Sequence, residues 1–203
     1  MSSLAQQIDW KKNDGLVPAI IQDSATLQVL MLGYMNREAL EATLTSKRVT
    51  FYSRSKERLW QKGESSENYL NLVSIQLDCD QDTLLICAQP DGPTCHLNTT
   101  SCFGDDHAPG IGFLSHLENV IRQRSTEMPE GSYTTTLFEK GIDKIAQKVG
   151  EEAVETVIAA KNTEKGPLVN EVSDLLYHLL VLLRQKDTDL SEIMEILRQR
   201  HSA

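Results

Sequence analysis

Leu70-Asn71-Leu72-Val73-Ser74-Ile75-Gln76-Leu77 runs directly into Asp78-Cys79-Asp80-Gln81-Asp82, and the architecture of the first half depends on this stretch. The first eight residues alternate as a β-strand does, and in a strand the side chains at i, i+2 and i+4 share one face. If the strand continues, Asp78, Asp80 and Asp82 point to one side and Cys79 points to the other. The stretch therefore predicts two kinds of metal ligand on opposite faces, hard carboxylate oxygens and a soft thiolate.

The composition and the first residues restrict the classes of function. The chain has 203 residues and a net charge of −9, which argues against binding to nucleic acid or to an anionic membrane surface. Residues 1–7 lack the basic and apolar pattern of a signal peptide, and no apolar run approaches the ~20 residues of a membrane span. We therefore expect a cytoplasmic protein, whose clustered cysteines stay reduced and bind metal more often than they form disulfides.

A change of pattern near residue 110 divides the chain in two. Residues 104–112 carry three glycines, a proline and two aspartates, which is the composition of a linker. We expect an α+β domain over residues 1–112, with a mostly antiparallel sheet and a zinc site, and an all-α domain over residues 113–203. The expected strands span 17–23, 27–34, 49–52, 70–78 and 83–89. The first expected helix is capped by Asn36 and ends near residue 46. Four more are expected at 113–125, 134–161, 168–185 and 190–200, and Thr134 or Thr135 is expected to cap the helix at 134–161.

Three of the four cysteines, Cys79, Cys95 and Cys102, stand at C-x15-C-x6-C. Three thiolates with an open fourth position favour a catalytic zinc ion that activates water. His96, next to Cys95, is a candidate for a fourth ligand or for an acid–base group. The spacing is not that of a zinc finger or ribbon, so the pattern alone also allows reduced structural cysteines or a closed structural zinc site.

The segment 53–66 combines four basic residues with four serines and a glycine. Such a segment can cradle phosphate groups through guanidinium, ammonium, hydroxyl and backbone donors. It can equally be an ordinary solvated hairpin. The candidates for contact with phosphate are Ser53, Arg54, Ser55, Lys56 and Lys62.

The helical half carries a second acidic group. On one predicted helix Glu151, Glu152 and Glu155 share a face, and on the next Glu171, Asp174 and His178 lie close together in the helical projection. Two such helices can gather four or five carboxylates around Mg²⁺, a cation that handles phosphates. The alternative is pairing of Lys148 with Glu152 on a solvated face. It does not explain Asp174, a costly carboxylate in a run of leucines and valines.

These motifs carry a resemblance that covers nearly the whole chain. The first half resembles phosphoribosyl-AMP cyclohydrolase and the second half resembles phosphoribosyl-ATP pyrophosphohydrolase, which in this order are fused in a bifunctional enzyme of bacterial histidine biosynthesis. The motifs of the first half are Gly15-Leu16-Val17-Pro18-Ala19, Met31-Leu32-Gly33-Tyr34-Met35-Asn36, Ser53-Arg54-Ser55, Leu59-Trp60-Gln61-Lys62-Gly63, Asp78-Cys79-Asp80-Gln81-Asp82, Cys95-His96 and Ser101-Cys102-Phe103. Those of the second half are Lys148-Val149-Gly150-Glu151-Glu152-Ala153-Val154-Glu155 and Glu171-Val172-Ser173-Asp174-Leu175-Leu176-Tyr177-His178.

The resemblance implies two consecutive hydrolyses of phosphoribosyl nucleotides. The second domain is expected to convert phosphoribosyl-ATP to phosphoribosyl-AMP and pyrophosphate with Mg²⁺, and the first to open the adenine ring between N1 and C6 with zinc-activated water. It implies a homodimer with one zinc ion per chain on Cys79, Cys95 and Cys102, of which Cys79 comes from the partner. The implied magnesium ligands are Asp78, Asp80 and Asp82, and Glu151, Glu152, Glu155, Glu171 and Asp174. The implied catalytic residues are His96, Glu152 and Glu155, and Lys148 joins the residues expected to bind substrate.

One position departs from the family, and two other interpretations stay open. The family usually continues Gly63-Glu64 with Thr-Ser-Gly, whereas this chain has Ser65-Ser66-Glu67, which adds a negative charge beside the expected phosphate site. The first alternative is a zinc-stabilised binding module fused to a helical dimerisation domain. The second is a housecleaning nucleoside triphosphate pyrophosphohydrolase with an accessory zinc domain, because related pyrophosphohydrolases share the acidic helices.

Overall fold

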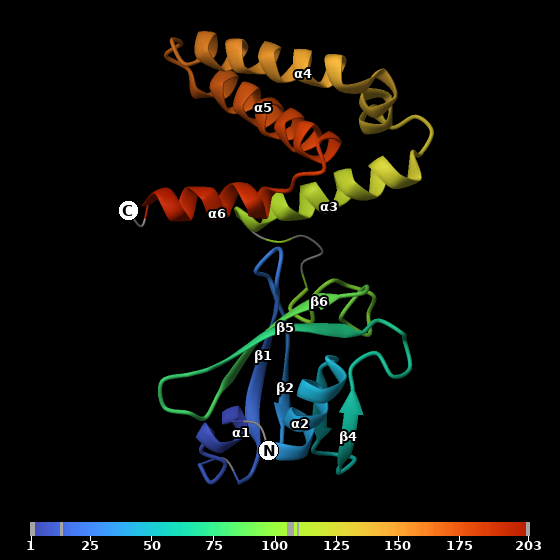
Figure 1. The fold of residues 1–203 in the computed structure, drawn as a ribbon, viewed down its shortest axis with the longest axis vertical. Helices are drawn as coiled ribbons and strands as arrows, with labels where there is room; N and C mark the ends of the chain where they lie inside the picture. The colour runs from blue at the N-terminus through green and yellow to red at the C-terminus, as the bar shows by residue number, and fades with distance from the viewer. Residues whose placement is uncertain (1–2, 13, 105–107, 109, 202–203) are drawn as a thin grey trace. The chain divides into compact units, whose positions relative to one another are not determined.

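The computed structural model describes residues 3–12, 14–104, 108 and 110–201. The chain divides into two compact units, Met1–Phe113 and Leu114–Ala203, one residue beyond the boundary expected after residue 112. The first unit contains the strands and the second is built from helices (Figure 1). The predicted fold class, an α+β unit followed by an all-α unit, is confirmed.

A four-stranded mixed sheet in the order β2-β1-β6-β5 forms the frame of the first unit. Strand β1 (Val17–Asp23) pairs antiparallel with β2 (Val29–Met35) and parallel with β6 (Leu84–Pro90). Strand β5 (Leu70–Leu77) pairs antiparallel with β6. Two of the three pairings are antiparallel, as expected. The parallel pairing joins segments far apart in the chain, so no local pattern announces it.

Two helices and a hairpin complete this unit: α1 (Ser3–Gln7), α2 (Arg37–Ser46), β3 (Thr50–Ser53) and β4 (Arg58–Gln61). Asn36 caps α2, because its side-chain oxygen accepts a hydrogen bond from the Ala39 N–H at 2.8 Å. Strands β3 and β4 pair antiparallel. The hairpin predicted as one alternative for the basic segment is therefore present.

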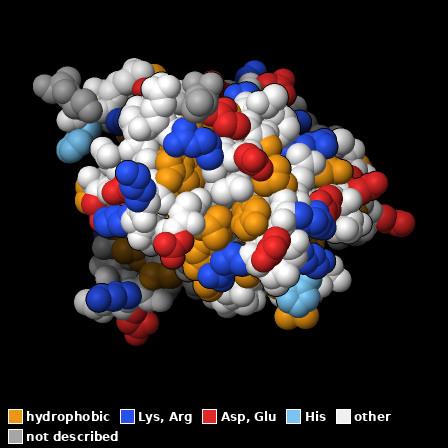
Figure 2. Space-filling model, turned by 90° about the horizontal axis from the view of Figure 1, so that it is seen from below, with side chains coloured by type: hydrophobic (Ala, Val, Ile, Leu, Met, Phe, Trp, Pro, Cys, Tyr) orange, Lys and Arg blue, Asp and Glu red, His pale blue; other side chains and the backbone are white. Residues whose placement is uncertain are grey.

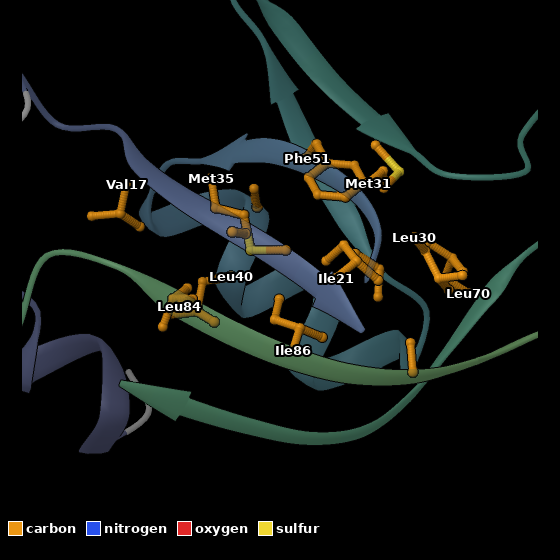
Figure 3. Packing of buried hydrophobic residues seen from close by; sticks show 14 of the residues in the cluster. Val17, Ile21, Leu30, Met31, Met35, Leu40, Phe51, Leu70, Leu84 and Ile86 are labelled. Atoms are coloured by element: carbon orange, nitrogen blue, oxygen red, sulfur yellow. The ribbon is translucent and has the colours of Figure 1, made fainter. Parts of the chain in front are cut away.

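Alternate residues of β1 point into the core, as the strand period of two requires. Val17, Ala19 and Ile21 are fully buried, and Figure 3 shows Val17 and Ile21 among side chains from β2, β3, α2 and β6. Gly33 of β2 lies against Phe51, because a Cβ built at Gly33 would meet Phe51 Cδ1 at 2.4 Å. The glycine thus makes room for the largest fully buried side chain of the core.

Four helices form the second unit: α3 (Gly112–Glu127), α4 (Tyr133–Ala159), α5 (Lys165–Gln185) and α6 (Leu190–His201). The cap of α4 is Ser132, whose hydroxyl accepts from the Thr135 N–H at 3.4 Å, so the expectation of Thr134 or Thr135 at the cap is wrong. Thr135 lies inside the helix and donates its hydroxyl to the carbonyl of Pro129 at 3.0 Å. Gly141, with φ 77° and ψ −174°, interrupts α4, and the sequence pattern did not predict this break.

The helical unit leaves apolar side chains on its surface. Its core gathers Ile121, Leu137, Ile145, Leu180 and Val181 from α3, α4 and α5. Helix α6 buries no residue, and Val154, Val157 and Ile158 of α4 are each more than half exposed. Such residues on a packed helix indicate a surface that another chain can cover.

Charges of both signs are interspersed on the face shown in Figure 2, with apolar side chains between them. Among the ion pairs of the first unit, Arg58 Nη2 at the start of β4 lies 2.5 Å from Glu64 Oε1 in the turn that follows the strand. Within the ranges that the structure describes, no helix has the length and apolar character needed to cross a membrane.

Candidate functional site

The aspartates after β5 lie in a turn. The strand ends at Leu77, and Asp78 Oδ1 accepts hydrogen bonds from the N–H groups of Asp82 and Thr83, both at 3.0 Å. The strand therefore does not continue through residue 82, so the condition for alternation of these side chains is not met, because the side-chain bonds replace the strand conformation. The carboxylates still come together: Asp78, Asp80 and Asp82 each offer an oxygen within 4.8 Å of the others.

Lys12 supplies a positive charge to this turn. Its Nζ forms ion pairs with Asp80 and with Asp82 Oδ2, the latter at 2.7 Å. The hydrogen bond from Lys12 holds the pKa of Asp80 below its usual range. The N–H of Asp9 donates to the carbonyl of Gln81 at 2.8 Å, so the N-terminal segment is tied to the turn at two points. The sequence gives no local sign of this lysine, because it lies far from the turn along the chain.

A cavity of about 430 Å³ holds the other candidate groups of the first unit. Cys95, Cys102, His96 and Lys62 line it, together with Thr94. Cys95 is buried, and Cys95 Sγ lies 3.8 Å from His96 Nδ1. Two thiols and an imidazole at one cavity wall are a donor set that suits zinc.

The two cavity thiols differ in their electrostatic environment. Hydrogen bonds from the Leu97 backbone and then from Thr99 lower the pKa of Cys95, whereas burial raises the pKa of Cys102. Cys102 is anchored to the sheet, because its N–H donates to the carbonyl of Leu30 at 2.8 Å. Burial lowers the pKa of Lys62, and the nearby sulfurs of Cys102 and Cys95 oppose that shift.

Cys79 stands apart from the other two predicted zinc ligands. It is exposed, and it does not line the cavity that contains Cys95 and Cys102. The three sulfurs do not all lie within 4.8 Å of one another in one chain. A single chain therefore brings two of the three cysteines together.

The predicted phosphate contacts separate into three places. Lys62 is 8% exposed and lies in the cavity with the cysteines. Ser53, Arg54 and Ser55 line a neighbouring hollow of about 370 Å³, where the Arg54 guanidinium carbon lies 3.9 Å from the centre of the Tyr34 ring. Lys56 is exposed and lines neither space.

Residue 67, which departs from the family pattern, also has an unusual backbone conformation. Glu67 adopts a left-handed φ of 61° at a position where the resembling family usually carries glycine. Ser65, Ser66 and Asn68 line the cavity, whereas Glu67 does not. The negative charge expected beside the phosphate site is thus carried by an exposed side chain outside the cavity wall.

The acidic helices gather three carboxylates. Glu152 and Glu155 of α4 and Glu171 of α5 each offer an oxygen within 4.8 Å of the others. Glu152 is 5% exposed. Desolvation, followed by repulsion from Glu152 and Glu171, raises the pKa of Glu155. One buried carboxylate, Glu152, that lies beside the more exposed Glu155 and Glu171 and is repelled by them fits a divalent cation, which neutralises the group.

The remaining predicted residues of this site lie outside the trio. Lys148 Nζ contacts Glu151 Oε2 and Glu152 Oε1, each at 2.9 Å, so the helical pairing proposed as an alternative is present. Glu151 also accepts from Gln147 at 2.6 Å. Asp174 is exposed and does not join the group. The argument that its carboxylate is costly is therefore wrong for the single chain, because water solvates it.

Two family models match the chain, one in each unit. The model described as phosphoribosyl-AMP cyclohydrolase matches residues 31–104, and the model described as phosphoribosyl-ATP pyrophosphohydrolase matches residues 114–201. The two matches occur in the order of the sheet unit and the helical unit. These matches favour the interpretation in which each half is an enzyme. They disfavour the alternative of a single housecleaning hydrolase with an accessory domain.

Curated relatives match along almost the whole length. The histidine biosynthesis bifunctional protein HisIE of Photobacterium profundum is 54% identical over 205 residues, covering 98% of this chain and 99% of the relative. The protein of the same name from Escherichia coli (strain K12) is 55% identical over 196 residues, covering 97% and 96%. That of Bacteroides thetaiotaomicron is 54% identical over 197 residues, covering 97% of each.

The fold and the order of the two units agree with these matches. A sheet unit with paired thiols precedes a helical unit with clustered carboxylates. The chain belongs to the family of bifunctional histidine-biosynthesis proteins, in which a phosphoribosyl-AMP cyclohydrolase domain is followed by a phosphoribosyl-ATP pyrophosphohydrolase domain.

Proposed function

We propose that this chain catalyses two consecutive hydrolyses in the cytoplasm. Residues 113–203 hydrolyse phosphoribosyl-ATP to phosphoribosyl-AMP and pyrophosphate. Residues 1–112 then open the adenine ring of phosphoribosyl-AMP between N1 and C6. The names of the relatives and the two family models support this pair of reactions.

The observation that carries the first reaction is the group of Glu152, Glu155 and Glu171 on facing helices. We assign it to Mg²⁺, which supplies positive charge to the triphosphate and orders its oxygens. Glu152 and Glu155 hold the cation and position the attacking water. Glu151 and Asp174 lie on the same helices and join the ligand set when substrate and cation are bound, and Lys148 is freed to contact phosphate.

The second reaction is assigned to the cavity with Cys95 and Cys102. We assign zinc to these thiols, and the ion supplies a water molecule of lowered pKa. His96 moves a proton at the ring nitrogen of the substrate. Lys62, Ser53, Arg54, Ser55 and Lys56 receive the substrate phosphates, and Mg²⁺ at Asp78, Asp80 and Asp82 assists them.

The zinc site requires a homodimer in this proposal. Cys79 is exposed and separate from the cavity thiols of its own chain, so we assign it to the zinc ion of a second copy. Each dimer then holds two zinc ions. The exposed apolar residues of α4, Val154, Val157 and Ile158, offer further surface for contact between copies.

Two variants test the separation of the activities. Glu152→Gln keeps the shape of the side chain and removes its charge, so pyrophosphate release from phosphoribosyl-ATP should fall by at least about 100-fold. Ring opening of added phosphoribosyl-AMP should remain at the wild-type rate. Cys102→Ala should give the opposite result. Loss of both activities in either folded variant would contradict the two-site proposal, and turnover of dATP or dUTP without phosphoribosyl-ATP would favour the housecleaning function.

The dimer has a separate test. Zinc content and mass in solution are measured for the wild type and for Cys79→Ser. We expect one zinc ion per chain in a dimeric wild type, and loss of zinc in the variant. A monomer that retains full ring-opening activity would reject the shared site.

A further inference from the structure

A buried histidine lies beside the proposed magnesium site and has no role in the reactions described so far. His178 of α5 is 4% exposed, and its Nε2 lies 3.8 Å from Glu152 Oε1 on α4. The other ring nitrogen, Nδ1, is buried and has no hydrogen-bond partner within the part of the chain that the structure describes. One edge of the imidazole therefore faces the carboxylate, and the other makes no hydrogen bond.

The unpartnered Nδ1 favours one protonation form of the ring. A buried N–H without an acceptor costs the desolvation of a donor. A neutral imidazole with its proton on Nε2 leaves only a lone pair at Nδ1. This difference in cost favours the form of His178 that carries its proton on Nε2, toward Glu152. At 3.8 Å this N–H is just beyond hydrogen-bond distance, and a small movement of the carboxylate completes the bond.

Two tyrosines hold the imidazole in this orientation. The Tyr177 ring lies 5.1 Å from the His178 ring at 74°, and the Tyr133 ring lies 6.0 Å away at 81°. The hydroxyl of Tyr177 is itself fixed by a 2.9 Å hydrogen bond with Thr134 Oγ1. Edge-to-face packing of this kind restricts the rotation of a buried ring. The direction of the Nε2–H is therefore set before any substrate binds.

Two donors converge on one oxygen of Glu152. Lys148 Nζ contacts Oε1 at 2.9 Å from the same helix, and His178 approaches Oε1 from α5. Donors on one carboxylate oxygen set the rotation of the group and direct its other oxygen elsewhere. The remaining oxygen of Glu152 is then the one available to a cation shared with Glu155 and Glu171.

We propose that His178 is a positioning residue of the pyrophosphohydrolase. It donates from Nε2 to Glu152 and sets the orientation in which this carboxylate binds the cation. When substrate and cation bind and Lys148 turns to phosphate, His178 is the donor that stays on Glu152. The inference rests on the proposed function of the helical unit. It requires a donor at Nε2 and no transfer of a proton through the ring.

Two substitutions separate donation from the other roles of the ring. His178→Gln keeps an N–H near the Nε2 position but cannot take up a proton, and His178→Phe keeps a ring without a donor. We expect kcat for pyrophosphate release within about threefold of wild type for His178→Gln, and a loss of about 10- to 100-fold for His178→Phe. His201→Gln, at an exposed position of α6, is the matched control and should equal wild type.

Metal affinity provides a readout that does not depend on turnover. Calorimetry with Mn²⁺ uses the full chain with Asp80→Asn and Asp82→Asn, which removes the cation site of the first unit. We expect His178→Phe to weaken Mn²⁺ binding about 10- to 100-fold and His178→Gln to leave it near the unsubstituted value. Ring opening of phosphoribosyl-AMP, measured with Asp80 and Asp82 intact, should be unchanged in both variants.

Three results would overturn the inference. Equal losses of kcat in His178→Gln and His178→Phe would indicate that the ring transfers a proton and does not only donate a hydrogen bond. If His178→Phe keeps the wild-type kcat and the wild-type Mn²⁺ affinity, His178 does not act at the site. If the wild type releases no pyrophosphate, the proposed function itself fails, and the inference with it. Should His178→Phe not fold by circular dichroism, His178→Asn, whose amide lies at the Nδ1 position, replaces it and is expected to lose activity to the same extent.

Discussion

Lys12 and Asp80 lie 68 positions apart in the chain, and their side chains form an ion pair at the turn after β5. The same ammonium contacts Asp82 Oδ2 at 2.7 Å. One lysine thus balances two of the three carboxylates that we propose for a divalent cation. Because the ammonium and a metal ion need the same oxygens, they compete for the turn.

Removal of the ammonium is expected to strengthen metal binding at the turn. Lys12→Met retains an unbranched side chain without a charge, so Mn²⁺ should bind there about tenfold more tightly than in the wild type. Calorimetry is performed in a chain with Glu152→Gln and Glu155→Gln, which removes the helical site. Lys12→Arg keeps the positive charge and should resemble the wild type. Weaker binding in Lys12→Met would show that the lysine supports the site instead.

Glu67 offers a test of backbone strain. Its φ of 61° is a conformation that glycine adopts freely and other residues adopt at a cost. We therefore expect Glu67→Gly to raise the free energy of unfolding of the first unit by about 1 kcal/mol. Glu67→Gln, which removes the charge but keeps the strain, is the control for urea denaturation. An equal gain in both variants would assign the effect to charge.

The stability of the helical unit should fall below pH 6.5 through His178. Burial, opposed by Glu152, lowers the pKa of His178 from its ordinary 6.5. Between the lowered pKa of the folded chain and 6.5, the unfolded chain therefore binds a proton that the folded chain does not, so stability decreases as the pH falls through this interval, by at most about 1.4 kcal/mol per pH unit. Above pH 6.5 this contribution is constant.

Urea denaturation at about pH 7.5 and about pH 5.5, with metal ions chelated and helix content followed by circular dichroism, measures this dependence. His178→Gln should show a smaller loss of stability between the two pH values than the wild type. The charged groups that face the ring, Glu152, Lys148, Asp174 and Glu151, are the same in both proteins. An identical pH dependence would rule out His178 as its source.

Gly33 should tolerate no side chain. Its Cβ would meet the Phe51 ring at 2.4 Å inside a packed core, so Gly33→Ala is expected to lower the free energy of unfolding by about 1–3 kcal/mol. Gly166→Ala, at a helical position with open space around the new methyl group, is the control. A Gly33→Ala protein as stable as the wild type would mean that the ring shifts without cost.

Local patterns predicted the elements well where one physical signal dominates. The strand predicted at residues 17–23 has the same bounds as β1, and the Asn36 side chain caps α2 as its type indicates. Helical periodicity located α3, α5 and α6 to within a few residues. The parallel pairing of β1 with β6 and the break at Gly141 were not predicted, because each depends on tertiary packing that a single segment does not encode.

The candidate sites show the same division. Residue types and spacing selected the aspartates and the acidic helices, and the structure brings Asp78, Asp80 and Asp82 together through turn bonds that alternation did not foresee. The helical projection could not separate Glu152, Glu155 and Glu171 from Glu151 and Asp174, because their grouping depends on how α4 and α5 face each other. Lys12 was missed for a similar reason, since its partners are distant in sequence.

The parallel contact of β1 with β6 has a consequence for synthesis on the ribosome. The first strand of the sheet cannot gain its central neighbour until residues through Pro90 have emerged, and closing so long a loop slows folding. Until then the nascent hairpin of β1 and β2 exposes an unpaired edge that other chains can join. In the helical unit the main contact, between α4 and α5, joins helices that follow one another in sequence, so this contact can form without such a delay.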